Sequence, residues 1–161
     1  MFIGMGDHYQ GLTMELLCFF VDQHRYALEL QHVYRVFPAV TVSPLPDGPG
    51  ILQGVVNVHG QAIGVVRLRE RLGLPARALS VSDKLIWVRS QELDLLLPVD
   101  DIDDVYLLSQ PKLAETSDFP ALPALVKGVV ILHDGLMFIQ DLARLLSLQE
   151  QQEARDALAA L

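Results

Sequence analysis

The chain passes twice through the same series of apolar segments, and this internal repeat limits its fold more than any other feature. In the early part of each copy, corresponding residues lie 69 positions apart, and in the later part they lie 74 positions apart. Such pairs are Tyr26 with Leu95, Leu28 with Leu97, Val36 with Val105, Gly54 with Gly128, His59 with His133 and Leu68 with Leu142. The offset changes in the middle loop of each copy, where extra length costs little. The sequence therefore predicts a duplicated unit.

Within each copy the apolar residues favour strands. Leu17, Phe19 and Val21 alternate with period two in the first copy, and the second copy opens with the apolar run Leu85 to Val88. Each copy continues through a polar turn, further extended segments, a loop containing Pro, a hairpin and a short helix. Five short antiparallel strands fit a small barrel, because closure removes exposed edges. We therefore predict an all-β fold of two five-stranded barrels in tandem, with short helices at their ends.

The repeat also sets the expected boundaries. Residues 1–13 show no period and predict a flexible leader, while residues 14–75 and 83–148 predict the first and the second barrel. Exchange of strands between the barrels stays open, because alternation does not say which strands pair. Residues 149–161 are polar and then rich in alanine, which predicts a helical tail of open role.

The charge balance argues against one large class of functions. Twelve Lys and Arg stand against twenty Asp and Glu, which gives a formal net charge of -8. A protein that binds nucleic acid needs a basic face for the phosphate backbone, so we expect no nucleic-acid partner. The N-terminus lacks the features of a signal peptide, and no apolar run reaches the roughly 18 residues of a membrane helix. We expect a cytoplasmic protein without direct membrane insertion.

Residues that support nucleophilic catalysis or phosphate binding are sparse. Cys18 is the lone cysteine and lies in an apolar run, which favours a core position over a reactive thiol. Trp87 lies in an apolar strand and is expected in the core as well. The sequence contains neither a Gly-x-Ser-x-Gly element nor a glycine loop of the kind that binds phosphate. We therefore expect no catalytic residue and no enzyme.

Candidate metal ligands are present but poorly spaced. The histidines are His8, His24, His32, His59 and His133. They lack the close paired spacing of a zinc site, so we expect no metal and no cofactor. The run from Asp100 to Asp104 lacks the central glycine of a calcium loop, and alternation points Ile102 inward. We interpret the run as a solvated acidic edge that is also open to a basic partner.

The order of short segments in the two copies indicates a particular protein family. The segments of the first copy are Tyr26-Ala27-Leu28-Glu29-Leu30, Val33-Tyr34-Arg35-Val36, Gly54-Val55-Val56-Asn57-Val58-His59-Gly60 and Val65-Val66-Arg67-Leu68-Arg69. The segments of the second copy are Leu96-Leu97-Pro98-Val99-Asp100, Gly128-Val129-Val130, Asp134-Gly135-Leu136 and Asp141-Leu142-Ala143-Arg144-Leu145-Leu146. Together they resemble the CheW-type chemotaxis coupling proteins, from about Met14 to Leu148, in order and in spacing.

The resemblance implies two SH3-like barrels around a shared core. It also implies a non-enzymatic adaptor that couples a CheA-type histidine kinase to the cytoplasmic tips of chemoreceptors. In this family a groove between the barrels takes the receptor tip, and the end of one barrel meets the kinase. Carried onto this chain, the expected partner-binding residues are Val33, Arg35, Val36, Asn57, His59 and Gly60.

Two alternatives remain at this point. For the two valines a core role is the simpler explanation, and for Asn57 and Gly60 it is the geometry of a tight turn, whereas for Arg35 and His59 docking is as simple an explanation as a structural role. The rival function is a free-standing SH3-like module that binds a small ligand, or another protein outside chemotaxis. Such a module would need a concave pocket with a few convergent polar groups.

Three positions depart from the family pattern. The family usually has Asn-x-Arg-Gly where this chain has His59 before Gly60, often an acid in place of Arg35, and an Asp in place of Arg67. If Arg35 and His59 occupy the places of the family's ion pair, two potentially cationic side chains meet, and neutral His59 is favoured. We therefore expect a divergent adaptor whose partner has a different charge pattern, for example in a system that controls pili.

Overall fold

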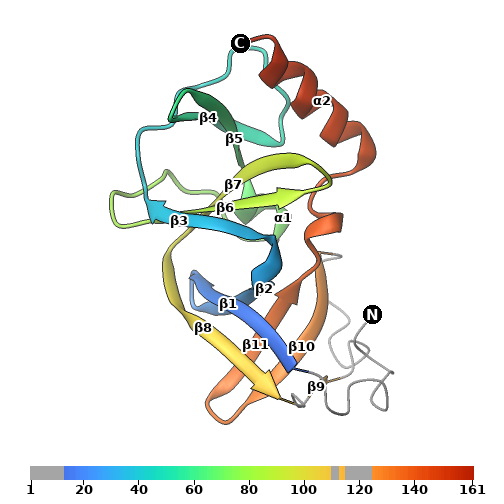
Figure 1. The fold of residues 1–161 in the computed structure, drawn as a ribbon. Helices are drawn as coiled ribbons and strands as arrows, with labels where there is room; N and C mark the ends of the chain where they lie inside the picture. Colours follow the sequence, from blue (N-terminus) through green and yellow to red (C-terminus); the bar gives the residue numbers. More distant parts are fainter. Residues whose placement is uncertain (1–12, 110–112, 115–124) are drawn as a thin grey trace.

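The computed structural model describes residues 13–109, 113–114 and 125–161 (Figure 1). The leader expected at residues 1–13 lies outside the described residues, except for Thr13. The prolines of the expected second loop, Pro111, Pro120 and Pro123, lie outside them too. Strands dominate the described part of the chain and form two sheets.

The elements follow the order that the alternation predicts. The first half contains β1 (Thr13–Val21), β2 (His24–Glu29), a 3-10 turn (Leu30–His32), β3 (Val33–Pro38), β4 (Leu52–Val58), β5 (Gln61–Val66) and α1 (Leu68–Arg71). The second half contains β6 (Lys84–Ser90), β7 (Leu93–Val99), β8 (Asp101–Ser109), β9 (Leu113–Ala114), β10 (Val126–Leu132), β11 (Gly135–Gln140), a 3-10 turn (Leu142–Arg144) and α2 (Leu148–Ala159). One sheet has six strands in the order β8-β1-β2-β11-β10-β9, and the other has five in the order β3-β6-β7-β5-β4. The predicted all-β fold of two small subdomains with short helices is confirmed, and one sheet has a strand more than the predicted five because β9 pairs with β10.

Each sheet is built from both halves of the chain. The hairpin β1–β2 belongs to the first half of the chain but pairs with β8 and β11 of the second half. The hairpin β6–β7 belongs to the second half but pairs with β3 and β5 of the first half. Residues 14–75 and 83–148 therefore delimit the repeat in the sequence, and neither segment forms a sheet by itself. The exchange ties the subdomains together, because each sheet needs a hairpin from the other half.

The strand registers repeat with the offsets seen in the sequence. The parallel pairing of β11 with β2 places Phe138 opposite Tyr26, and that of β5 with β7 places Gly64 opposite Leu95. Phe138 lies 74 positions after Gly64, and Leu95 lies 69 positions after Tyr26. β4 and β10 also share a bulge near their first residues. The duplication is therefore present in the backbone pairing.

Each sheet has a small core of its own, and a third core joins the two sheets. The first core contains Leu16, Cys18, Ala27, Val130, Met137 and Ile139, and the corresponding positions of the second hold Leu85, Trp87, Leu96, Val56, Ile63 and Val65. The third core combines residues of both sheets, such as Leu28 and Leu97. Burial of one such leucine contributes about 1.5–3 kcal/mol, so the third core holds the sheets firmly together. Cys18 and Trp87 are buried as predicted.

Short helices follow the last strand of each half. Gly73, with a φ of +74°, ends the turn after α1 in the left-handed conformation. In the second half, the Asp141 side chain precedes the 3-10 turn and accepts a hydrogen bond from the backbone N–H two residues on, at 3.1 Å. α2 begins with a capping box of Ser147 and Glu150. It packs on the third core through the fully buried Ala154, so this part of the tail is a docked helix.

Candidate docking surface

β3 forms one edge of the five-stranded sheet and carries three of the predicted partner-binding residues. Val33 and Val36 are half-buried and pack against the core that the two sheets share. Arg35 lies opposite Trp87 of β6, beside a bulge, and its side chain is exposed. An edge strand leaves one row of backbone N–H and C=O groups without a strand partner, and such a row accepts added chains.

An exposed aromatic ring stands on this edge. The Tyr34 side chain is 64% exposed, and its ring centroid lies 4.5 Å from that of Trp87 at an interplanar angle of 53°. Trp87 is buried, so a fixed indole supports the exposed phenol ring. Aromatic pairs of this kind contribute on the order of 0.5–1.5 kcal/mol beyond the area they bury. Tyr, Trp and Arg are the residues that most often dominate binding at protein interfaces.

A row of polar contacts continues from β6 across β7 to β5. Arg89 Nε donates to Asp94 Oδ1 at 2.7 Å, and Gln61 Nε2 donates to Asp94 Oδ2 at 3.1 Å. The hydrogen bond from Arg89 is the main reason why the pKa of Asp94 lies below its ordinary value. Arg89 lies two residues after Trp87 on β6, and therefore on the same face of the sheet. Tyr34, Arg35, Gln61, Arg89 and Asp94 are called the β3 rim below.

The other three predicted residues lie at the β4–β5 hairpin: Asn57 is near the end of β4, and His59 and Gly60 form the turn before Gln61. His59 and Gly60 have φ values of +51° and +86°, as a two-residue hairpin turn requires. Asn57 Oδ1 accepts a hydrogen bond from the Gly60 N–H at 2.8 Å. Asn57 and Gly60 therefore build the turn, and His59 is exposed at its tip. Gln61 joins this turn to the β3 rim through its bond to Asp94.

The predicted residues thus form two groups that the β3 rim connects. One group lies on β3 and the other beside β4, and these strands stand at opposite ends of the strand order. Within residues 13–109, no hydrogen bond or ion pair joins Arg35 to His59. The expected meeting of two cationic side chains stays a prediction.

Sequence reasoning missed four members of the β3 rim: Tyr34, Gln61, Arg89 and Asp94. A signal for the last two was present, because both flank the predicted turn of the hairpin β6–β7. Residues directly opposite each other in a hairpin share one face, and Arg89 is indeed paired with Asp94. Tyr34 gave no such signal, since its exposure depends on β3 being an edge strand.

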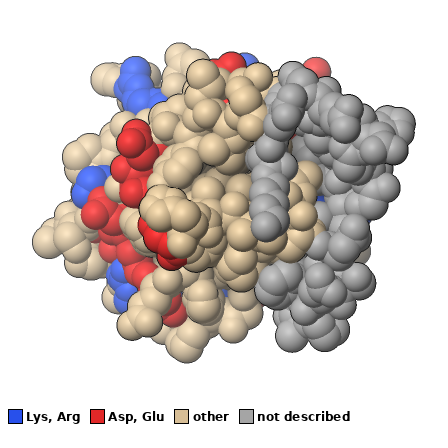
Figure 2. All heavy atoms as spheres, turned by 90° about the horizontal axis from the view of Figure 1, so that it is seen from below, with Lys and Arg blue, Asp and Glu red and all other residues tan. Residues whose placement is uncertain are grey.

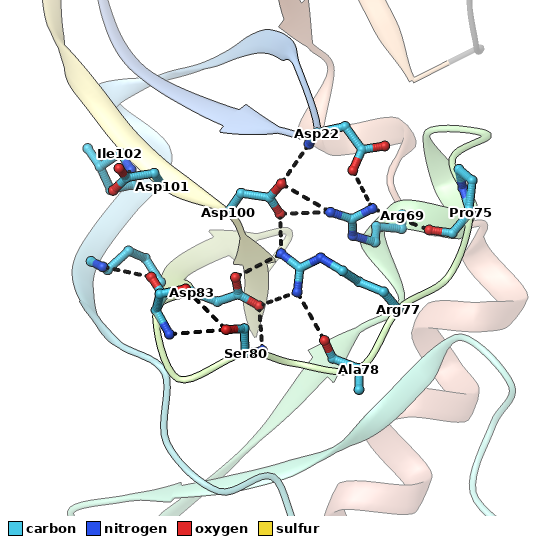
Figure 3. A network of polar contacts seen from close by, with 12 residues as sticks. Asp22, Arg69, Pro75, Arg77, Ala78, Ser80, Asp83, Asp100, Asp101 and Ile102 are labelled. Atoms are coloured by element: carbon cyan, nitrogen blue, oxygen red, sulfur yellow. Dashed lines mark hydrogen bonds and ion pairs between the residues drawn. The ribbon is translucent and has the colours of Figure 1, made fainter.

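Five charged side chains form a network at the junction of the two sheets (Figure 3). Arg69 donates to Asp22 at 2.7 Å and to both oxygens of Asp100 at 2.8 and 3.1 Å. Arg77 donates to Asp100 at 2.7 Å and to both oxygens of Asp83 at 2.8 and 2.9 Å. Asp22 lies in the β1–β2 turn, Asp100 between β7 and β8, and Asp83 before β6. The network therefore links segments from both halves of the chain.

The network corrects one expectation about the acidic run. Asp100 does not belong to a solvated edge, because it lies where the chain crosses between the sheets and is paired with two arginines. Asp103 is also engaged, since it accepts a hydrogen bond from the Tyr106 hydroxyl at 2.7 Å. Asp101 and Asp104 are exposed, as the alternation predicts.

Arg77 and Asp83 stabilise each other's charged form. The hydrogen bond to Asp83 is the main reason why the pKa of Arg77 is raised. Burial is the largest single influence on the pKa of Asp83 and acts to raise it, but the hydrogen bonds from Arg77 and from the Ser80 backbone N–H together lower it below 3.8. Both side chains are therefore charged at neutral pH.

Acidic side chains gather at the end of the molecule that Figure 2 shows from below. Asp and Glu lie along one side of this face, beside a few Lys and Arg. In the six-stranded sheet, Arg25 pairs with Asp134 through bonds of 3.1 and 3.3 Å.

Burial raises the pKa of the Cys18 thiol to about 12, so the thiol stays protonated and unreactive.

Two further findings concern the described residues alone. None of their helices is long and apolar enough to cross a membrane. No group of three or more His, Cys, Asp or Glu side chains among them is arranged to hold a metal ion. The exposed β3 rim is the feature of this region from which a binding function is best argued.

Comparison with known proteins adds a family to this geometry. A family model described as CheW-like domain matches residues 15–150. The chain is 24% identical over 144 residues to the chemotaxis protein CheW of Rhizobium meliloti, with 87% of this chain and 92% of the relative covered. It is 23% identical over 132 residues to the chemotaxis protein CheW of Thermotoga maritima, with 82% and 87% covered.

A solved structure shares the fold. It is the crystal structure of the scaffolding protein TtCheW from Thermoanaerobacter tengcongensis, which superposes with a TM-score of 0.76 at 21% identity. The superposition covers 86% of this chain and 96% of that chain. Because the family model spans most of the residues, including the exchanged hairpins and the β3 rim, this chain belongs to the CheW-like domain family.

Proposed function

We propose that this chain is a non-enzymatic adaptor that couples the cytoplasmic tips of chemoreceptors to a CheA-type histidine kinase, in a chemotaxis or chemotaxis-like pathway. The observation that carries the proposal is the CheW-like domain over residues 15–150. Relatives named chemotaxis protein CheW, and a scaffolding protein of the same fold, support it. The adaptor would act in the cytoplasm, where both partners present their binding surfaces.

The β3 rim provides what a protein partner needs. Tyr34 is an exposed ring on a fixed support, so little side-chain entropy is lost when a partner covers it. Arg35 is exposed beside it and suits a carboxylate of the partner. An acidic partner is therefore favoured at this edge, which agrees with a partner of altered charge pattern.

An adaptor must hold two partners at once, and the repeat supplies two equivalent edges. β8 is the counterpart of β3 and forms an edge of the six-stranded sheet. Apart from Ser109 at its end, its exposed side chains are aliphatic or acidic: Val105 is 48% and Leu107 is 67% exposed, and Asp101 and Asp104 are exposed as well. The two edges thus have the same backbone geometry and opposite charge, which allows one chain to distinguish two partners.

The test is a reconstitution with a CheA-type kinase and receptor cytoplasmic fragments from the source cell. We expect the three components to sediment together only when this chain is present. Competition with an ordinary CheW protein then tests the altered partner. We expect this chain to displace CheW poorly from a standard receptor–kinase pair, and equal displacement would show that its partner preference is unchanged.

A pair of variants ties the result to the surface. Tyr34→Ala removes the exposed ring and should weaken assembly about tenfold or more, as loss of a central interface residue does. Val81→Ala is the matched control, because Val81 is 96% exposed in the segment between the halves and lies outside the β3 rim. If both variants assemble like the native chain, the β3 rim is not the docking surface.

A further inference from the structure

The internal repeat places Arg67 and Asp141 at equivalent positions, each before a short helix. Their backbone N–H groups donate to the equivalent carbonyl groups of Ile51 and Leu125. The Asp141 side chain caps its helix, whereas the Arg67 side chain makes no capping bond. Arg67 Nε donates instead to the carbonyl of Gly50 at 2.9 Å. In the first half, α1 therefore lacks a side-chain cap, and a guanidinium group stands at the capping position.

Arg67 lines a cavity of about 340 Å³, a volume suited to a small ligand. One wall of the cavity is the charged network of Figure 3. The carboxylate of Asp100 accepts side-chain bonds from Arg69 and Arg77 and one backbone bond from Asp22. The carboxylate of Asp83 accepts bonds from Arg77 and from backbone. These charges are already satisfied by one another.

Two other lining side chains still have hydrogen-bond donors to offer. Within residues 13–109, the terminal nitrogens of Arg67 and the amide of Gln53 make no hydrogen bond. Leu79 and Pro98 add apolar surface to the same cavity. Glu70 also lines the cavity and is exposed, and within residues 13–109 no hydrogen bond or ion pair joins it to Arg67.

We propose that this cavity binds a small organic carboxylate. The ligand's carboxylate pairs with the terminal nitrogens of Arg67, whose planar fork matches it, and accepts a bond from Gln53. The carbon chain of the ligand lies against Leu79 and Pro98. The cavity lies apart from the β3 rim, and binding of a small carboxylate goes beyond the adaptor function. The proposal of this site is therefore independent of the proposed protein partners.

The test is a titration of the full chain with succinate, citrate and glutamate at constant ionic strength. The NMR signals of the Arg67 Nε–H group and of the Leu79 amide report on the cavity. We expect saturable shifts of these signals with at least one of the acids, and none with the neutral analogue succinamide. The proposal is overturned if no acid gives a saturable shift, or if inorganic phosphate alone does.

Arg67→Asp is the decisive variant, because it installs the residue found at the equivalent position 141. It should weaken binding roughly tenfold or more, since a charge-assisted pair is lost, and its melting temperature should equal or exceed that of the native chain. Arg67→Gln serves as a second variant should the first fail to fold. Arg144→Ala removes a cation whose side chain is 63% exposed and does not line the cavity, and it should bind normally. Native affinity in both Arg67 variants, or an equal loss in Arg144→Ala, contradicts a specific site.

Discussion

Replacement of Arg69 by methionine tests the charged network that joins the two sheets. Methionine retains much of the aliphatic length of arginine and removes the guanidinium. The lost bonds are those to Asp22 at 2.7 Å and to Asp100 at 2.8 and 3.1 Å, together with a longer bond to the Pro75 carbonyl at 3.3 Å. The Arg69 side chain is 13% exposed, so water screens these pairs only in part.

The expected loss lies between two limits. Exposed ion pairs contribute about 0–1 kcal/mol, and removal of one partner from a fully buried pair costs about 3–5 kcal/mol. After the substitution Asp100 still has Arg77 as a partner, and Asp22 is 37% exposed and regains water. We therefore expect Arg69→Met to lower the free energy of unfolding by about 2 kcal/mol.

Urea unfolding measures this loss. With a slope of about 1–3 kcal/mol per molar urea, the midpoint should fall by roughly 1 M. Arg89→Met is the matched control, since Arg89 also pairs with an aspartate but its side chain is 62% exposed. The control should lose clearly less stability. If Arg69→Met loses no more than Arg89→Met, the network does not hold the sheets together.

The remaining predictions concern acid stability, a helix cap and a tight strand. The pKa of Asp83 is lowered in the folded state, so its charged side chain stabilises the folded protein above pH 3.8, and this stabilisation is lost as the pH falls through the folded pKa. Asp83→Asn should therefore flatten the fall of the free energy of unfolding in acid titrations. Ser147→Ala removes the cap of α2 and should cost about 0.5–2 kcal/mol in urea unfolding, while Ser147→Asp should retain most of the stability. Gly54→Ala would place a Cβ atom 2.4 Å from the Ser43 carbonyl oxygen, so we expect a loss of roughly 1–3 kcal/mol by calorimetry, against little change for Gly50→Ala, where nothing lies within 4 Å.

Much of the fold follows from sequence pattern alone. The period-two alternation located the strands, and the offsets of 69 and 74 residues agree with the strand registers. The pairing of β1 with β8 was beyond such reasoning. Alternation tells which side chains share a face, but it does not tell which strands are neighbours, and the exchange of hairpins depends on that choice.

The candidate site was predictable only where local chemistry decides the structure. Asn57 and Gly60 have the residue types of a tight turn, and they form one. Asp100 and Tyr34 depend on distant partners instead. Asp100 meets arginines that are 31 and 23 positions away in the chain, and Tyr34 contacts a tryptophan from the other half. Contacts of this kind follow from the exchanged topology and have no local signature.

Hydrogen exchange of the full chain, alone and in the assembly with kinase and receptor fragments, tests the adaptor function most directly. Backbone amides of β3 and of the β4–β5 turn should exchange more slowly in the assembly, because partners cover this edge and the β3 rim. The β8 amides should gain protection only when both partners are present. Unchanged exchange in β3 and in the β4–β5 turn, with protection confined to α2 or absent, would contradict a docking surface at the β3 rim.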